Sequence, residues 1–156
     1  MARRRKAEQR NLQPDPKYNS DLVAKMINYV MRCGKKSTAE GIIYSVLDQI
    51  EAKMKQDPLE VLVRAVDNMK PRVEVKSRRV GGATYQVPVE VSRRRQVDLA
   101  LRWLIQYARM RKGMPMHKTM AIEIMDAFKN EGNVIKKRDD THKMAQANRA
   151  FAHYAW

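Results

Sequence analysis

The sequence has few of the residues that carry redox chemistry, metal binding or catalysis. Its single cysteine, Cys33, excludes an internal disulfide and fits the reducing cytosol. The three histidines, His117, His142 and His153, are scattered, so no spacing typical of a metal site emerges. We therefore expect no metal and no other cofactor.

Long apolar runs and flexible linkers are also missing. No apolar run approaches the roughly 20 residues of a membrane span, so we expect no membrane as a partner. The pair Gly81-Gly82 is too short for a glycine-rich nucleotide loop. No stretch rich in glycine and serine divides the chain, so its 156 residues predict a single domain with a substantial core.

Acidic residues are scarce relative to basic ones. The chain has 17 Asp and Glu against 32 Lys and Arg, a net charge of +15. Such a charge repels itself in the folded chain and is best tolerated when a polyanion neutralises it. The charge is also clustered, which favours nucleic acid over a generally basic surface, in Arg3-Arg4-Arg5-Lys6, Lys35-Lys36, Arg78-Arg79, Arg93-Arg94-Arg95, Arg111-Lys112 and Lys136-Lys137-Arg138.

Residues 72–91 predict a two-stranded β-hairpin. Valines alternate with polar residues on both sides of Gly81-Gly82, a pair that suits positive φ in a tight turn. Pro88 cannot donate a ladder hydrogen bond and therefore suits an edge strand. An isolated hairpin is marginal in water, so we expect it to lean on the helices or on a partner. Tyr85 could stack on a base, but packing beneath the hairpin is the favoured interpretation.

The remaining sequence predicts about six helices. A first begins after Ser20, a capping box at residues 37–40 opens a second, and Asp57-Pro58 begins a third. A fourth is expected to be capped by Ser92. A fifth is expected over about 116–128 and a sixth over about 134–150, followed by aromatic anchors at 151–156.

The predicted fold class is mainly α. It is a single bundle of about six helices with a protruding two-stranded β-hairpin arm and an extended basic N-terminal tail. Residues 1–18 are expected to form the basic arm, disordered alone and ordered on a partner. Residues 19–156 are expected to form the helical domain, with its hairpin at 72–91.

The run Arg93-Arg94-Arg95 is the sharpest electrostatic feature. It falls in the first turn of a predicted helix, where the helix dipole is positive and acidic residues are favoured. Three arginines there are unfavourable unless an anion binds, and a helix N-terminus with arginines suits a phosphate. We therefore interpret this turn as a phosphate site rather than as a merely solvated face.

Several segments together resemble the bacterial family of ribosomal protein seven of the small subunit. The resemblance covers essentially the whole chain. It rests on LQPDP at 12–16, GKKS at 34–37, RRVGGATYQVPVEV at 78–91, ALRW at 100–103, KKRDDTHKMA at 136–145 and ANRAFAHY at 147–154.

The resemblance implies a helical bundle with a β-ribbon that binds the 3′ major domain of small-subunit rRNA. It implies an early role in assembling the head and a place near the tRNA exit site and the mRNA path. Exit-site tRNA, mRNA and the ninth and eleventh small-subunit proteins would then be neighbours. Some members also repress their own mRNA. The location would be the cytoplasmic ribosome, and no homo-oligomer is expected.

The candidate RNA-binding residues come from the charge clusters and from positions that match the family. Most would contact phosphates, which set position rather than sequence. They are Arg3, Arg4, Arg5, Lys6, Arg10, Lys35, Lys36, Arg72, Lys76, Arg78, Arg79, Arg93, Arg94, Arg95, Arg102, Arg111, Lys112, Lys136, Lys137, Arg138 and Lys143.

Two rival interpretations stay open beside a non-enzymatic rRNA-binding protein. An architectural duplex-DNA binder would also combine helices with a basic ribbon, but it requires an apolar wedge at the ribbon tip. The tip here is Gly81-Gly82-Ala83, which provides no wedge. An RNA-processing enzyme could use Asp139, Asp140 and His142 with a metal ion. Surface pairing along a helix explains these acidic residues better.

Overall fold

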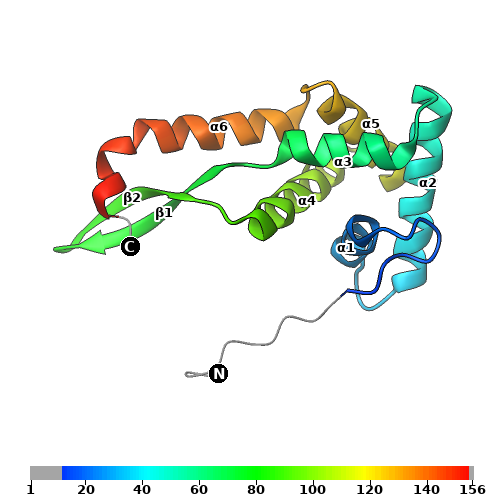
Figure 1. Cartoon of the computed structure of the whole chain (residues 1–156), viewed down its shortest axis with the longest axis horizontal. Coiled ribbons are helices and arrows are strands. Elements are labelled where there is room, and N and C mark those ends of the chain that lie inside the picture. Colours follow the sequence, from blue (N-terminus) through cyan, green and yellow to red (C-terminus); the bar gives the residue numbers. More distant parts are fainter. Residues whose placement is uncertain (1–11, 155–156) are drawn as a thin grey trace.

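The computed structural model describes residues 12–154, which form an elongated molecule (Figure 1). The fold class predicted above, mainly helical with one β-hairpin, is confirmed. Among the described residues, no helix has both the length and the apolar character to cross a membrane. The elements are α1 (Asp21–Val30), α2 (Lys36–Met54), α3 (Pro58–Met69), β1 (Val73–Val80), β2 (Ala83–Glu90), α4 (Arg93–Met110), α5 (Met116–Phe128), α6 (Asn133–Ala147) and the 3₁₀ helix η1 (Arg149–Tyr154).

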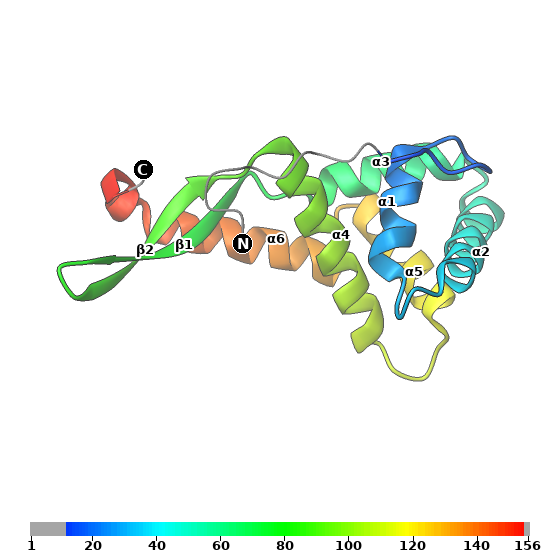
Figure 2. The ribbon, with the colours of Figure 1, turned by 90° about the horizontal axis from the view of Figure 1, so that it is seen from below.

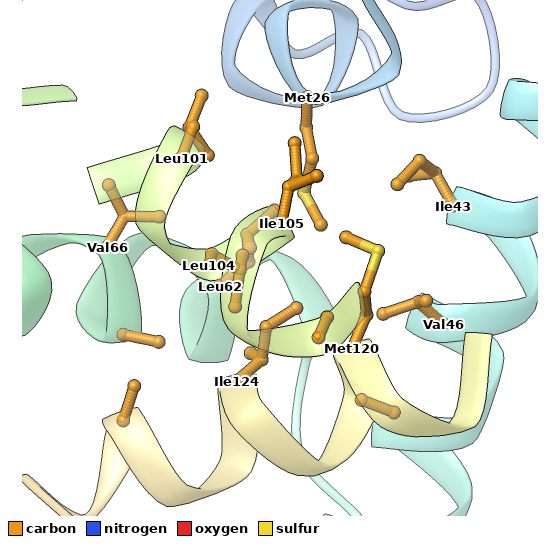
Figure 3. Packing of buried hydrophobic residues seen from close by; sticks show 14 of the residues in the cluster. Met26, Ile43, Val46, Leu62, Val66, Leu101, Leu104, Ile105, Met120 and Ile124 are labelled. Atoms are coloured by element: carbon orange, nitrogen blue, oxygen red, sulfur yellow. The ribbon is translucent and has the colours of Figure 1, made fainter. Parts of the chain in front are cut away.

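Five helices build the core at one end of the molecule. Each sends an apolar stripe inward, because apolar residues recur along it at helical spacing. Full burial of one such side chain contributes roughly 1.5–3 kcal/mol. The centre, shown in Figure 3, includes the fully buried Met26 of α1, Ile43 of α2, Leu62 of α3, Leu104 of α4 and Ile124 of α5.

The sixth helix leaves this core and runs beside the hairpin (Figures 1 and 2). Only Val134 and Ile135, in its first turn, belong to the core cluster. Farther along, Thr141 and Ala145 are its buried residues. The buried residues of this helix are therefore divided between the bundle core and the part of the helix that runs beside the hairpin. Helix α6 and the hairpin together form an arm that projects from the bundle.

The hairpin turns at Gly81-Gly82, as its sequence predicts. Strands β1 and β2 pair antiparallel, with Val80 opposite Ala83 and Arg78 opposite Tyr85. Gly81 and Gly82 lie between them with φ of 57° and 89°, in the region that favours glycine. Two adjacent positive φ values let a short loop follow the twist of the strands.

The helix starts agree with the prediction less well than the helices themselves. The capping box predicted at residues 37–40 is wrong, because α2 begins at Lys36 and its N-cap residue Lys35 makes no side-chain cap bond. Ser20 and Ser92 stand at the N-caps of α1 and α4, but neither side chain caps its helix. Asp57 does cap α3, accepting a hydrogen bond from the Leu59 backbone N–H at 2.9 Å.

The C-terminal end also differs from prediction. Helix α6 ends at Ala147 rather than near residue 150. At this end the Asn148 backbone N–H and side-chain amide both donate to the Met144 carbonyl, at 3.1 and 2.8 Å. The chain then turns into η1, which brings Phe151 and Tyr154 back onto the hairpin.

Residues 12–18, predicted as part of the extended arm, pack on the helices in this structure. The buried Asp15 carboxylate accepts hydrogen bonds from the Lys17 and Tyr18 backbone N–H groups, each at 3.1 Å, and from the Tyr44 hydroxyl at 2.8 Å. Burial and this hydrogen bond to Asp15 raise the pKa of Tyr44 to about 12. The bond therefore ties the segment to α2 throughout the physiological pH range.

Candidate nucleic-acid interface

The positive charge is divided unequally along the chain. Residues 12–70, which include α1–α3, hold 9 Lys and Arg against 8 Asp and Glu. Residues 71–154, which include the hairpin and α4–α6, hold 18 against 8, or +10 of the total +15. The second part of the chain therefore carries most of the potential for binding a polyanion.

The root of the hairpin meets the first turn of α4 through Glu74. Its carboxylate accepts two hydrogen bonds from Arg95 Nε, at 2.9 and 3.0 Å, and one from Arg95 Nη2 at 2.8 Å. Lys76 Nζ lies 3.3 Å from the same carboxylate. Burial opposes ionisation here, but the hydrogen bonds from Arg95 and Lys76 hold the pKa of Glu74 below its ordinary value.

Arg93 and Arg94 differ from Arg95 in their surroundings. Both side chains are exposed in the first turn of α4. Within residues 12–154, neither makes a hydrogen bond or an ion pair. Arg95 is already paired with the Glu74 carboxylate of β1. We therefore expect an anion at this turn to bind mainly to Arg93 and Arg94. The helix N-terminus adds unpaired N–H groups to the same position.

The outer half of the hairpin is held by the C-terminal 3₁₀ helix. The Tyr85 ring lies 5.2 Å from that of Phe151 and 5.3 Å from that of Tyr154, between centroids, both tilted. The Arg78 guanidinium donates to the Tyr154 carbonyl. Tyr85 therefore packs against protein, the favoured interpretation above, while Arg79 stays exposed on β1.

Helix α6 is tied to the hairpin root through its histidine. Nε2 of His142 accepts a hydrogen bond from the Arg72 backbone N–H at 3.0 Å. Burial, and then the nearby Arg138 and Arg72 charges, lower the pKa of His142 against the opposing effect of Asp139. The imidazole is thereby kept neutral and able to accept, while the Arg72 side chain is exposed.

The other candidates on α6 fall into two groups. Lys136 and Lys143 are exposed, and Lys137 is half-buried. Arg138 instead pairs with Asp139 at 2.7 Å. It also donates to the Asn68 carbonyl of α3. Of the residues of the enzyme hypothesis, His142 is bound to the hairpin and Asp139 to Arg138, while Asp140 is exposed. No candidate metal cluster occurs among residues 12–154.

Arg111 has a role that sequence reasoning missed. Its Nε lies 2.7 Å from Oε1 of Glu123, whose side chain is fully buried, and its Nη2 lies 3.3 Å from Oδ2 of Asp126. Arg111 thus joins the end of α4 to α5, while its neighbour Lys112 is exposed in the connecting loop. Nothing in the local sequence marks the fully buried Glu123 as the partner.

The remaining candidates lie at the α1–α2 corner and along α4. Lys35 and Lys36 are exposed, and Lys36 pairs with Glu40 at 3.5 Å. The Arg102 guanidinium lies 5.8 Å from the centroid of the Tyr29 ring. The candidates nearest the N-terminus, Arg3, Arg4, Arg5, Lys6 and Arg10, lie outside the described residues.

Comparison with known proteins gives a consistent result. A family described as ribosomal protein S7p/S5e matches residues 2–149. The chain is 62% identical to a protein of Anaeromyxobacter sp. (strain K) and 56% identical to one of Sorangium cellulosum (strain So ce56), over the full 156 residues of all these chains. It is 58% identical over 154 residues, 99% of each chain, to one of Thermotoga neapolitana. Each relative is named small ribosomal subunit protein uS7.

Proposed function

The chain belongs to the ribosomal protein S7p/S5e family, and from that premise we propose that it binds the 3′ major domain of small-subunit rRNA and organises assembly of the head. It is a structural protein of the small ribosomal subunit in the cytoplasm, and its part is in translation rather than in catalysis. It supplies no reacting group; it holds RNA segments in position.

The observation that carries the proposal is the unequal division of charge. Residues 71–154 provide an excess of ten positive charges, spread over the hairpin, α4 and α6. Phosphates would be bound by the exposed cations of these elements, including Arg79, Arg94, Lys136 and Lys143. Because base edges in A-form grooves are hard to reach, recognition would rest on the shape of helix junctions and on 2′-hydroxyls.

A salt-titrated binding competition tests this function. Labelled 3′-major-domain rRNA competes with an unrelated structured RNA and with duplex DNA of equal charge for the full-length protein. We expect a preference for the rRNA that persists as salt rises, because shape-specific contacts do not release counterions. Equal and salt-labile binding to all three nucleic acids would refute the proposal and would leave the DNA-binding alternative open.

The arm of α6 and the hairpin would lie near the tRNA exit site and the mRNA path, with the ninth and eleventh small-subunit proteins as neighbours. In a Cys33→Ser background, a photoreactive group on Ala83→Cys would report this from the exposed hairpin tip. Crosslinks from assembled subunits to tRNA or mRNA are expected. Crosslinks only to rRNA of the subunit body would contradict the placement.

A further inference from the structure

A groove lies beside the α2–α3 corner, residues 55–57, at the end of the bundle opposite the arm (Figure 1). Its volume is about 370 Å³, and its lining residues are Gln56, Asp57, Glu60, Val61, Arg64 and Phe128. The start of α3 forms one side, and Phe128, the last residue of α5, forms the other. None of these residues is among the RNA-binding candidates.

The groove belongs to a segment with an acidic excess in an otherwise basic chain. Residues 37–63 have five Asp and Glu against two Lys and Arg, a net charge of −3 in a chain of +15. Glu40 and Asp48 pair with lysines outside this segment, at 3.5 and 3.3 Å. Within residues 12–154, the exposed Glu51 and Glu60 make no ion pair and no hydrogen bond, and Asp57 makes only the cap bond of α3 through Oδ1. Carboxylate oxygens in the groove are therefore available to a cation.

The outer face of α3, beside the groove, is not covered by another element of the described chain. It is made of exposed residues that lie three or four positions apart, namely Glu60, Val63, Arg64 and Asp67. Val63 is 47% exposed although it is apolar. The Arg64 guanidinium lies 4.9 Å from the centroid of the Phe128 ring. A basic side chain entering the groove could likewise pack its aliphatic stem on Phe128 and keep its charged head near the carboxylates.

The charge of this surface decides between RNA and protein as its partner. A segment of −3 repels phosphates, whereas a lysine- and arginine-rich segment of another protein complements it. Extended basic segments are typical of proteins that bind nucleic acid, and the small subunit brings such proteins together. A second copy of this chain would offer its own basic arm, but the proposed function assigns that arm to rRNA.

We propose that the groove and the outer face of α3 form a docking surface for a basic, extended segment of a neighbouring small-subunit protein. Its cationic head groups would bind Asp57 and Glu60, and its apolar groups would pack beside Val63 and Phe128. The inference goes beyond rRNA binding and rests only on the place of this chain in the small subunit. The acidic excess of residues 37–63 was the signal available in the sequence.

A crosslink from the groove identifies the partner. In a Cys33→Ser background, Gln56→Cys carries a photoreactive group at the rim of the groove without removing a charge. Small subunits reconstituted with this full-length chain are irradiated, and the crosslinked product is identified by mass spectrometry. We expect one lysine- and arginine-rich segment of another ribosomal protein. Crosslinks to rRNA, crosslinks to a second copy of this chain, or no crosslink at all would overturn the inference.

The role of the carboxylates is tested with a synthetic peptide that has the sequence of the crosslinked segment. Asp57→Asn/Glu60→Gln removes both charges from the full-length protein, and asparagine at position 57 keeps an N-cap for α3. Loss of two exposed ion pairs should weaken peptide binding about 2- to 30-fold at low salt, with a smaller difference at high salt. The matched control Glu90→Gln/Asp140→Asn removes two exposed carboxylates from the arm and should bind the peptide as wild type does.

Equal peptide affinity of Asp57→Asn/Glu60→Gln and wild type would contradict the docking surface. Equal losses for this variant and the control would also contradict it, because net charge rather than the groove would then govern binding. In addition, Asp57→Asn/Glu60→Gln should bind the 3′-major-domain rRNA with the affinity and salt slope of wild type, because no phosphate contact is lost. Weaker rRNA binding would place RNA at this corner and overturn the inference.

Failure of the inference and failure of the proposed function give different results. If wild type prefers the 3′-major-domain rRNA but Gln56→Cys crosslinks only to RNA, the docking surface falls and the proposed function stands. If wild type shows no preference for that rRNA but the crosslink reaches a basic protein segment, the proposed function falls and the docking surface stands.

Discussion

At the scale of single residues, the basic side chains divide into two kinds. Some are held by carboxylates of the chain itself, as Arg95 is by Glu74 and Arg111 is by Glu123. Others, such as Arg94 and Lys136, are exposed on the surface. Only the second kind can give its full charge to a phosphate. A candidate list based on charge alone therefore overestimates how much the first kind contributes to RNA binding.

Arg111 is expected to act on stability rather than on RNA binding. Arg111→Gln leaves the fully buried Glu123 carboxylate without its cation, and removing one partner of a buried pair costs about 3 kcal/mol. Urea unfolding should show this loss, and Arg111→Gln/Glu123→Gln should recover most of it because no buried charge remains. Lys112→Gln is the adjacent control and should be neutral. Equal stability of Arg111→Gln and wild type would contradict the role.

His142 is expected to make stability depend on pH. The pKa of His142 is lowered from its ordinary value of 6.5 in the folded chain. Below pH 6.5, the unfolded chain therefore binds a proton at this histidine more readily than the folded chain does. Stability is therefore fully present above that pH and falls as pH decreases below it, by at most about 1.4 kcal/mol per pH unit. His142→Gln keeps an acceptor for the Arg72 N–H and should lose this decrease. Urea unfolding at pH 7.5 and 5.5 measures it, and parallel profiles for both chains would contradict it.

At the scale of elements, the hairpin depends on its neighbours for stability. Two strands alone are marginal in water, and here α6 and η1 supply the missing support. Their contacts reach both parts of the hairpin: His142 binds at its root, and the Tyr85 ring packs on Phe151 and Tyr154 farther out. The conformation of the hairpin is therefore coupled to the C-terminal segment.

Removing residues 149–156 should loosen the hairpin without unfolding the bundle. Two aromatic pairs are lost, each worth about 0.5–1.5 kcal/mol, so amide hydrogens of β1 and β2 should exchange roughly 5- to 150-fold faster. Amides of α3 and α5, which lie in the core, are the internal control and should keep their rates. Unchanged exchange in β1 and β2 would show that α6 alone supports the hairpin.

The sequence predicts elements better than it predicts the contacts between them. Apolar periodicity and the Gly81-Gly82 pair were sufficient for the helices and the hairpin, because these signals are local. The start of α2 was mispredicted, since Ser37 and Glu40 form a capping pattern that the chain does not use. The Arg111–Glu123 pair spans two helices and depends on how they pack, so no local pattern could reveal it.

At the scale of the whole molecule, the charge excess lies in residues 71–154, which include α4 of the core as well as the projecting arm. The end that contains α2 and α3 is nearly neutral and supplies much of the core, while the hairpin and α6 extend from it with an excess of positive charge (Figure 1). The nearly neutral residues 12–70 limit the self-repulsion that a charge of +15 would otherwise bring to the core. The arm carries charge that a polyanion can neutralise.

The central claim, that residues 71–154 carry RNA binding, is tested most directly by one paired salt titration. Arg93→Gln/Arg94→Gln removes two exposed cations from the charged part, and Lys53→Gln/Lys55→Gln removes two from the neutral part. Both variants lower the net charge equally. For binding to 3′-major-domain rRNA, the first should lower the log–log salt slope by about 1.4–1.8, and the second should leave it unchanged. Equal decreases for the two variants would contradict the account, because net charge rather than its placement would then govern binding.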